Sequence, residues 1–117
     1  MNNDALFGIH GAALEVRSRR MGMLASNIAN ASTPGYKATD VDFSEALNAV
    51  SRAGTDVDAA FSGAVKFRNP LQPSLDGNTV ELATEQTAFA ENAVAYQTTL
   101  SFLNGRINQI TRALKGE

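Results

Sequence analysis

The sequence predicts a mainly α-helical fold in which two long helices, one near each end of the chain, pair as an antiparallel coiled coil. The first observation is an apolar stripe near the C-terminus that keeps a strict 3.5-residue spacing. The second is a broad helical apolar face between residues 4 and 31. The third is the stretch between them, which favours a short helix and an irregular loop. The 117 residues form one structural unit with three parts, residues 1–35, 36–78 and 79–117.

The N-terminal part is predicted to be one long helix followed by a sharp turn. Its apolar residues fall on two neighbouring helical rows from Asp4 to Ala31, so the helix presents a face wide enough for more than one neighbour. Pro34 disfavours helical geometry at Thr33 and lacks an amide proton. The pair Pro34-Gly35 also fits the two central positions of a type II turn. The helix therefore ends before this turn.

The middle part is predicted to hold one short helix. Asp42 and Glu45 have the spacing of a capping box, and apolar residues then follow on one side, which favours a helix over residues 43–52. The sequence after it is rich in small residues, contains two prolines and has no sustained period. We expect it to be loop, with room for a brief extended piece at Val65–Phe67.

The C-terminal part is predicted to be the longer helix. Asn78 and Glu81 have capping-box spacing, which places the helix start near Thr79, and the pattern continues to about Leu114. Acidic residues gather toward its start and basic residues toward its end, which suits the helix dipole. Its apolar stripe consists of Phe89, Ala93, Tyr96, Leu100, Leu103, Ile107, Ile110 and Leu114.

This stripe predicts association with other helices. In an antiparallel pair the longer helix extends beyond the shorter one and carries Ile107, Ile110 and Leu114 with it. Contiguous exposed apolar surface usually marks an interface, and a head-to-tail contact that does not close on itself produces a helical filament. We therefore expect this chain to be a subunit of a tube or bundle.

A second candidate contact region lies where the first helix ends. Small side chains there allow close helix approach, while Asn27 and Asn30 can form hydrogen bonds that fix register. The predicted assembly interface combines this region with the stripe: Leu24, Asn27, Ile28, Asn30, Pro34, Gly35, Tyr36, Tyr96, Leu100, Leu103, Ile107, Ile110 and Leu114.

Composition argues against several functions. Ten basic and twelve acidic side chains give a net charge of -2, which provides no basic surface for nucleic acid. No segment reaches the length of a membrane-spanning helix, and the start of the chain lacks the pattern of a cleaved secretory signal. We expect neither direct membrane insertion nor a nucleic-acid partner.

Catalytic and metal-binding patterns are also lacking in the sequence. His10 is the single histidine and there is no cysteine, so histidine clusters and cysteine zinc sites have no ligands. The pairs Asp40/Asp42 and Asp56/Asp58 do not continue into the glycine and glutamate of an EF-hand loop. We predict no enzyme activity, no metal and no cofactor.

Three arginines, Arg17, Arg19 and Arg20, form a small basic cluster on the first helix. The simpler interpretation is a solvated face. The alternative hypothesis is that these arginines approach Glu91 of the same or a neighbouring subunit in the antiparallel pair.

Two runs of sequence, ASNIANASTPGYKATDVDF from Ala25 and GNTVELATEQTAFAENAVAYQTTLSFLNGRI from Gly77, carry a family resemblance. They resemble the bacterial flagellar rod, hook and hook-associated axial proteins, and most closely the B type of the proximal rod proteins. The C-terminal match places Asn78, Val80, Glu85, Phe89, Asn92, Tyr96, Gln97 and Leu100 at positions of the family pattern. The two runs cover nearly all of both long helices.

The resemblance implies a structural subunit of the proximal rod of the flagellar basal body. Such subunits line a hollow axial tube with their paired helices, and the rod transmits torque and passes exported subunits. The implied partners are other rod proteins and further copies of itself, the basal-body adaptor protein E, the flagellar export gate and the motor ring. The implied location is the periplasmic rod, reached through type III export without a cleaved signal peptide.

Two other classes remain as alternatives. A soluble helical adaptor or export chaperone would bury its apolar stripe in a small stable oligomer and would stay in the cytoplasm. An enzyme would need a concave site with perturbed ionisable groups, and no such site can be assembled from these residues.

Overall fold

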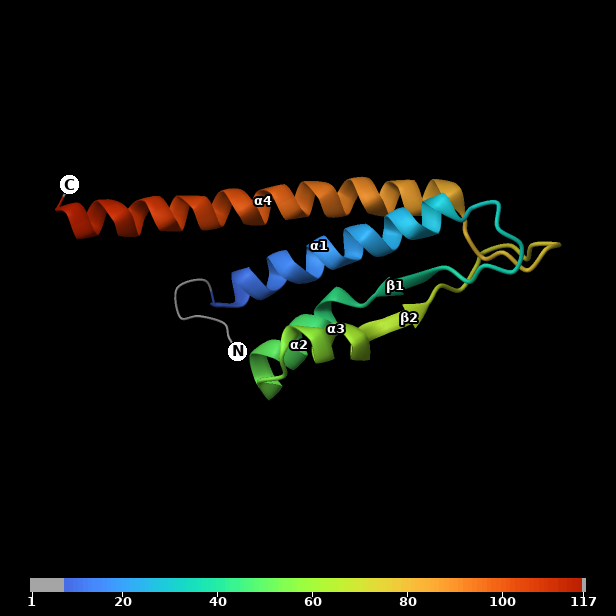
Figure 1. The fold of residues 1–117 in the computed structure, drawn as a ribbon, viewed down its shortest axis with the longest axis horizontal. Coiled ribbons are helices and arrows are strands. Elements are labelled where there is room, and N and C mark those ends of the chain that lie inside the picture. Colours follow the sequence, from blue (N-terminus) through green and yellow to red (C-terminus); the bar gives the residue numbers. More distant parts are fainter. Residues whose placement is uncertain (1–7, 117) are drawn as a thin grey trace.

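The computed structural model describes residues 8–116 and shows an elongated molecule that measures 64 × 27 × 18 Å. Three layers lie side by side along its length (Figure 1). The longest helix forms one layer, the N-terminal helix lies in the middle, and two short helices with a two-stranded sheet form the third. The elements are α1 (Gly8–Ala29), β1 (Thr39–Val41), α2 (Phe43–Ala53), α3 (Val57–Ala64), β2 (Val65–Phe67) and α4 (Leu82–Lys115).

The predicted antiparallel pairing of the two long helices is confirmed. Helix α1 runs toward the end of the molecule at which α4 begins, so the two chain directions are opposite (Figure 1). The 22 residues of α1 and the 34 residues of α4 give lengths of about 33 and 51 Å at 1.5 Å per residue. The last turns of α4 therefore project beyond α1, as the sequence predicts. Residues 4–7 of the expected N-terminal helix lie outside the described residues.

The middle part of the chain is more ordered than its sequence predicts. Helix α2 begins after Asp42, whose side chain accepts a hydrogen bond from the Glu45 amide at 3.0 Å. It ends at Gly54, whose positive φ of 68° suits a residue without a β-carbon. Beyond it, the expected loop contains a further helix, α3, capped by Asp56, and the strand β2. This helix escaped prediction because eight residues rich in alanine show no clear apolar period.

The two strands form a small antiparallel sheet. Val65–Phe67, which the sequence marks as a brief extended piece, pairs with Thr39–Val41 so that Thr39 lies opposite Phe67. The pairing continues past the strands, because the Arg68 amide donates to the Ala38 carbonyl at 2.9 Å. The sheet therefore brings Arg68 next to the residues that follow the end of α1.

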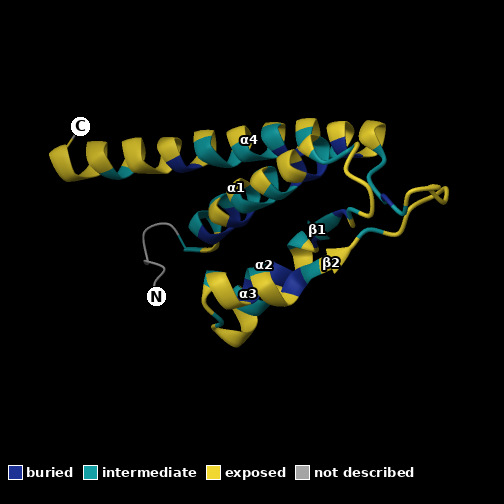
Figure 2. Ribbon diagram, turned by 45° about the vertical axis from the view of Figure 1, so that its right-hand side comes forward, coloured by how far each residue is buried: buried dark blue, intermediate teal, exposed yellow. Residues whose placement is uncertain are grey.

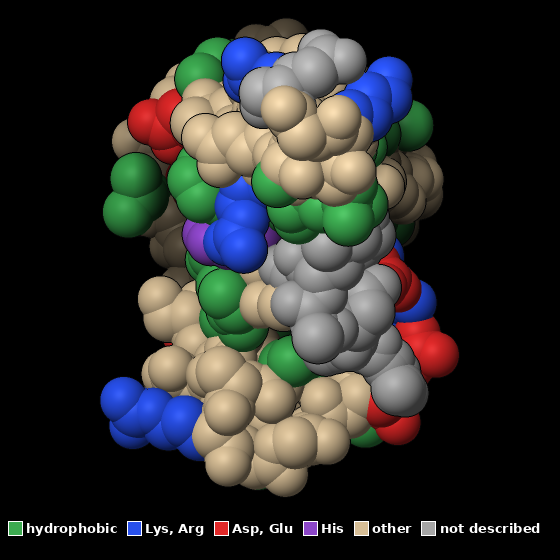
Figure 3. All heavy atoms as spheres, turned by 90° about the vertical axis from the view of Figure 1, so that its left-hand side faces the viewer, with side chains coloured by type: hydrophobic (Ala, Val, Ile, Leu, Met, Phe, Trp, Pro, Cys, Tyr) green, Lys and Arg blue, Asp and Glu red, His purple; other side chains and the backbone are tan. Residues whose placement is uncertain are grey.

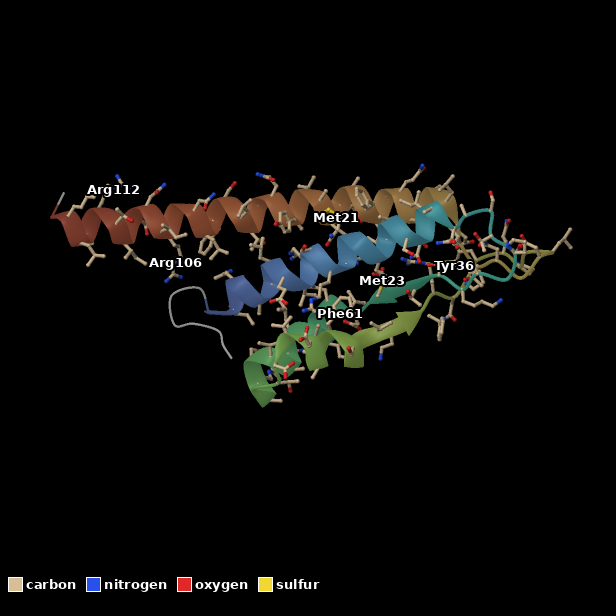
Figure 4. All side chains as sticks on the ribbon, viewed as in Figure 1. Met21, Met23, Tyr36, Phe61, Arg106 and Arg112 are labelled. Atoms are coloured by element: carbon tan, nitrogen blue, oxygen red, sulfur yellow. The ribbon has the colours of Figure 1, made fainter. Side chains whose placement is uncertain are left out.

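The core lies on both sides of α1. Val16, Val41, Ala46 and Ala64 form a buried cluster between α1 and the third layer, and Phe61 of α3 packs against it. On α1, Met21 points toward α4 and Met23 toward β1 (Figure 4). Buried residues accordingly follow α1 on both of these faces, whereas the outer face of α4 is exposed (Figure 2). The broad apolar face predicted for the first helix serves two neighbours within one subunit.

Helix α4 begins three residues later than predicted, at Leu82 rather than near Thr79. The capping-box interpretation fails because Asn78 and Thr79 have other partners. The Thr79 amide donates to the Tyr36 carbonyl at 2.9 Å, and its hydroxyl accepts from the Ala38 amide at 2.8 Å. These bonds hold the chain in an extended approach to the helix, so Glu81 becomes the cap residue without a capping side-chain bond.

Candidate assembly interface

The two long helices meet along a register set by three contacts. Asn27 of α1 donates to Glu85 of α4 at 3.0 Å near one end of the pair. Asn92 donates to the Arg17 carbonyl at 2.8 Å near the middle. The rings of His10 and Phe102 lie 4.5 Å apart at the other end.

The apolar stripe of α4 is only partly covered within the subunit. Leu103 is 5 % exposed, and Phe89, Ala93, Tyr96 and Leu100 are half-buried where they face α1. Beyond the end of α1, the stripe is no longer covered by that helix. Ile107 is 38 % and Leu114 is 84 % exposed, while Ile110 is half-buried. We call residues 104–116 the overhang. Its ribbon is yellow over most of its length in Figure 2, because most of its residues are exposed.

The other predicted interface residues lie at the opposite end of α1, with very different exposure. Leu24 and Asn27 are fully buried inside the subunit, so their side chains offer no surface to a partner. Ile28, Asn30 and Tyr36 are half-buried. Pro34 and Gly35 are exposed at the turn.

That turn has the predicted type II geometry. Gly35 has a φ of 75°, and the Tyr36 amide donates to the Thr33 carbonyl at 3.2 Å across the turn. The Gly35 amide also donates to the Asp76 carbonyl at 2.9 Å. The turn is therefore attached to the loop that precedes α4.

Asn78 connects the end of α1 to this loop, and we call this contact the joint. Its side chain is 7 % exposed, and its amide nitrogen lies 2.9, 3.2 and 2.7 Å from the carbonyl oxygens of Asn30, Ala31 and Thr33. Carbonyl groups at the end of a helix lack partners within the helix. The carbonyls of Asn30 and Thr33 also accept from the Thr33 and Tyr36 amides, and Asn78 adds contacts from a distant part of the chain that fix the end of α1 to the segment before α4.

A partly buried ionic network lies beside this joint and was not predicted from the sequence. Arg20 of α1 donates to both oxygens of Asp40, at 2.7 and 2.8 Å. Arg68 donates to the second oxygen of Asp40 at 2.9 Å and to Glu85 at 3.2 Å. Asn27 completes the network through its bond to Glu85. We call Arg20, Asn27, Asp40, Arg68 and Glu85 the polar clamp, since it joins α1, β1, the end of β2 and α4.

Glu85 is the most deeply buried charge of the polar clamp, with no exposed surface. The Nε atom of Arg68 lies 2.7 Å from its Oε2 atom. The angle of that approach does not make a hydrogen bond, so the contact is an ion pair, and Arg68 donates through its terminal nitrogen instead. A buried carboxylate is tolerated only when it is paired in this way.

Asn27 has a second function at the joint. Its amide nitrogen also donates to the Thr39 carbonyl at 2.7 Å, and its oxygen lies 3.3 Å from both the Thr39 amide and the Tyr36 hydroxyl. Figure 4 shows Tyr36 at the end of the molecule where these segments meet. The register role expected for Asn27 is therefore exerted between segments of one subunit.

The charge of the polar clamp depends on pH through the ionisation of Asp40. Burial acts to raise the pKa of Asp40, but hydrogen bonds from Arg20 and the Val41 amide, with the charge of Arg68, outweigh burial and hold that pKa below its usual value. The same bond raises the pKa of Arg20. Asp40 is therefore ionised in the folded chain at neutral pH.

We expect acid to remove the stability that Asp40 contributes. Because its folded pKa is below the unfolded value of about 3.9, the contribution is full above that value and is lost as the pH falls through the folded pKa. Asp40→Asn should cost about 2 kcal/mol of unfolding free energy at pH 7, the scale of charged hydrogen bonds. Urea unfolding of both chains at pH 7 and pH 3 measures the difference. A gap that stays constant with pH would contradict this linkage.

The arginine cluster forms no ion pair with Glu91 among the described residues; the pKa of Arg20 is raised mainly by its bond to Asp40, and the charge of Glu91 adds to this. Arg20 pairs with Asp40, and Arg19 pairs with Glu15 at 2.7 Å and with Asp58 of α3. The guanidinium of Arg17 lies 3.9 Å from the centre of the Phe43 ring. The cluster faces the third layer because α2 and α3, of which only α2 was predicted, cover this side of α1.

The acidic pairs of the sequence form no metal site within residues 8–116. Those residues contain no group of three or more His, Asp or Glu side chains placed to hold a metal ion. Asp42 and Asp56 cap helices, and Asp40 belongs to the polar clamp. None of the helices described has the length and apolar character needed to cross a membrane.

Comparison with known proteins bears on this architecture. Residues 8–37, which form α1 and the turn after it, match the family model described as flagella basal body rod protein. The chain is 48 % identical to the flagellar basal body rod protein FlgB of Cereibacter sphaeroides, over 94 % of this chain and 94 % of that protein. It is 45 % identical to FlgB of Aeromonas hydrophila, over 97 % and 96 %. It is 38 % identical to FlgB of Escherichia coli K12, over 96 % and 94 %.

This chain belongs to the FlgB family of flagellar basal body rod proteins. The resemblance drawn from the two helical runs is thereby confirmed. The family is named for its place in the rod of the flagellar basal body, which fits a structural subunit. The alignments cover 97 % and 94 % of this chain, so the similarity is not confined to the N-terminal helix.

Proposed function

We propose that this chain is a subunit of the proximal rod that assembles through its paired helices into a hollow axial tube. The tube transmits torque and passes exported subunits through its channel. The subunit reaches the periplasmic rod by export without a cleaved signal peptide. Its partners are other rod proteins, further copies of itself, the basal-body adaptor protein E, the export gate and the motor ring.

The observation that carries this proposal is the partly covered apolar stripe of α4. Ile107 and Leu114 project on a rigid helix past the end of α1, where no described residue of the subunit buries them. Burying a large aliphatic side chain stabilises a contact by about 1.5 to 3 kcal/mol. An overhang of this kind favours association with neighbouring subunits.

The internal architecture supports the same function. The polar clamp and Asn78 fix α1, α4 and the third layer into one rigid body. A subunit that transmits torque must keep its three layers from sliding past one another. Hydrogen-bonded ion pairs are directional, so they oppose such sliding, whereas apolar contacts alone allow several similar arrangements. We propose that the exposed predicted interface residues, Pro34, Gly35, Ile107 and Leu114, contact neighbours.

A deletion strain tests this function. We expect it to assemble the motor ring but no rod or hook, and to be non-motile, with rods restored when the gene is supplied in trans. Electron microscopy of isolated basal bodies provides the measurement. A deletion strain with complete rods would refute the proposal.

The alternative of a soluble adaptor or export chaperone predicts a different location. Such a protein would remain in the cytoplasmic fraction as a small stable oligomer. Recovery of the chain with purified basal bodies, and a monomer on sizing at low concentration, would favour the rod subunit.

A further inference from the structure

The two ends of the molecule carry opposite charge and exposed apolar side chains. One end holds the segment between β2 and α4, residues 69–81, which we call the tip loop. It lies beside the turn that follows α1 (Figure 1). The other end holds the overhang of α4.

The tip loop exposes apolar side chains that its own subunit does not cover. Leu71 is 86 % exposed, and Leu75 is as exposed as a residue in an extended peptide. The loop contains two acidic residues, Asp76 and Glu81, and no basic residue. Two cations lie next to it: Arg68 precedes the loop in the chain and belongs to the polar clamp, and the ammonium group of Lys37 is bound to the Gly77 carbonyl.

The overhang has the same apolar character and the opposite charge. Residues 104–116 contain Arg106, Arg112 and Lys115 and no acidic residue, beside the exposed Ile107 and Leu114. Arg106 and Arg112 point to opposite sides of the helix (Figure 4). The view onto this end shows basic and hydrophobic side chains together on the α4 side (Figure 3). Glu117 follows outside the described residues.

These two surfaces cannot meet within one molecule. They lie at opposite ends of a body 64 Å long, joined by a continuous helix of 34 residues. Contact between two overhangs would bring cations together, and contact between two tip loops would bring carboxylates together. Only contact between a tip loop and an overhang pairs opposite charges.

We propose that the tip loop of one subunit docks on the overhang of a second copy of this chain. Leu71 and Leu75 cover Ile107 and Leu114, while Asp76 and Glu81 face Arg106 and Lys115, whose helix positions flank that apolar pair. This contact rests on the proposed function as an assembling subunit and specifies which surfaces meet. Because the contact is heterologous, repetition produces an open chain of subunits rather than a closed pair.

Disulfide cross-linking tests the contact cleanly, since the chain has no cysteine of its own. Purified Leu75→Cys and Leu114→Cys chains are mixed at high concentration and oxidised, and the joined peptides are identified by mass spectrometry. We expect mixed 75–114 dimers to exceed both 75–75 and 114–114 dimers. Thr87→Cys, exposed on α4, replaces Leu75→Cys in the control and should give no excess of mixed dimers.

A single chain that carries both Leu75→Cys and Leu114→Cys distinguishes open from closed assembly. An open arrangement gives a ladder of oligomers on a denaturing gel, whereas a two-fold pair stops at the dimer. A dimer band alone, a dominant 114–114 product, or no cross-link at all would each overturn the proposal.

Charge reversal tests the electrostatic part in the same assay. Asp76→Lys should lower the yield of mixed dimers by about two- to fivefold, the effect of exposed charge pairs. Combining it with Lys115→Glu in the partner chain should restore the yield. If neither substitution changes the yield of mixed dimers, these charges do not contribute to the contact.

These results separate the contact from the proposed function. If the deletion strain lacks rods and no cross-link forms, the contact is wrong and the rod function stands. If the cross-link forms and the deletion strain builds normal rods, the contact stands and the function is wrong.

Discussion

Leu114→Asp is expected to abolish rod assembly while leaving the isolated subunit folded. Leu114 is 84 % exposed in the subunit, so the substitution removes almost no internal contact. In the assembled rod its burial is worth about 1.5 to 3 kcal/mol per contact, and burying a carboxylate without a partner adds a further penalty. Each contact should therefore weaken by more than about tenfold. Swimming in soft agar and electron microscopy of basal bodies measure the result.

Gln109→Asp provides the matched control for this variant. It introduces the same charge into the same exposed segment of α4, but on the side away from the apolar stripe. We expect it to assemble and swim, while circular dichroism shows both variants to be equally helical. If Leu114→Asp cells swim normally, the overhang has no role in assembly. The same conclusion follows if Gln109→Asp impairs swimming as strongly as Leu114→Asp does.

The long helices could be predicted because their signals are local and repeated. The spacing of the stripe from Phe89 to Leu114 identifies α4 from sequence alone, and Pro34-Gly35 identifies the turn after α1. Asp42 and Gly54 likewise mark the ends of α2 by their capping chemistry. Each of these features depends on residues a few positions apart, which a sequence displays directly.

The polar clamp could not be predicted because its members are far apart in the chain. Arg20, Asp40, Arg68 and Glu85 come from four separate segments, and each looks like an ordinary surface charge in the sequence. The small sheet brings Arg68 to the end of α1; the extended piece at Val65–Phe67 was expected, but its pairing with Thr39–Val41 and the helix α3 were not. The available signal was the position of Glu85 on the face of α4 that also carries Asn92, where a solvated charge does not belong.

The late start of α4 has a similar cause. Asn78 and Glu81 have valid capping spacing, but the side-chain oxygen of Asn78 accepts from the Val80 amide at 2.7 Å, two residues on, while its nitrogen contacts the turn after α1. Local propensity is overruled where a tertiary partner satisfies more backbone groups than the cap would. The start of α4 was therefore predicted too early because the residues before it bind the turn that follows α1.

Glu85→Ala is expected to lower the unfolding free energy of the subunit by about 3 kcal/mol, the cost of breaking a buried ion pair by removing one partner. The change removes the acceptor of both Asn27 and Arg68, and it leaves Arg68, whose side chain is 19 % exposed, with Asp40 as its remaining anion. In a domain of about this size such a loss lowers Tm by roughly 10 to 20 °C. Thermal and urea unfolding followed by circular dichroism measure it.

The reason for this cost is an uncompensated charge, which the partner substitution can reveal. In the chain that carries both Glu85→Ala and Arg68→Ala, no half-buried guanidinium is left beside the position that Glu85 occupied, so the combined loss should fall short of the sum of the single losses by more than about 1 kcal/mol. Glu91→Ala, an exposed carboxylate on the same helix, should change stability by less than about 0.5 kcal/mol. Strictly additive losses would mean that Glu85 acts through helix packing alone. The ion pairs of the polar clamp would then contribute little to the unfolding free energy of the subunit.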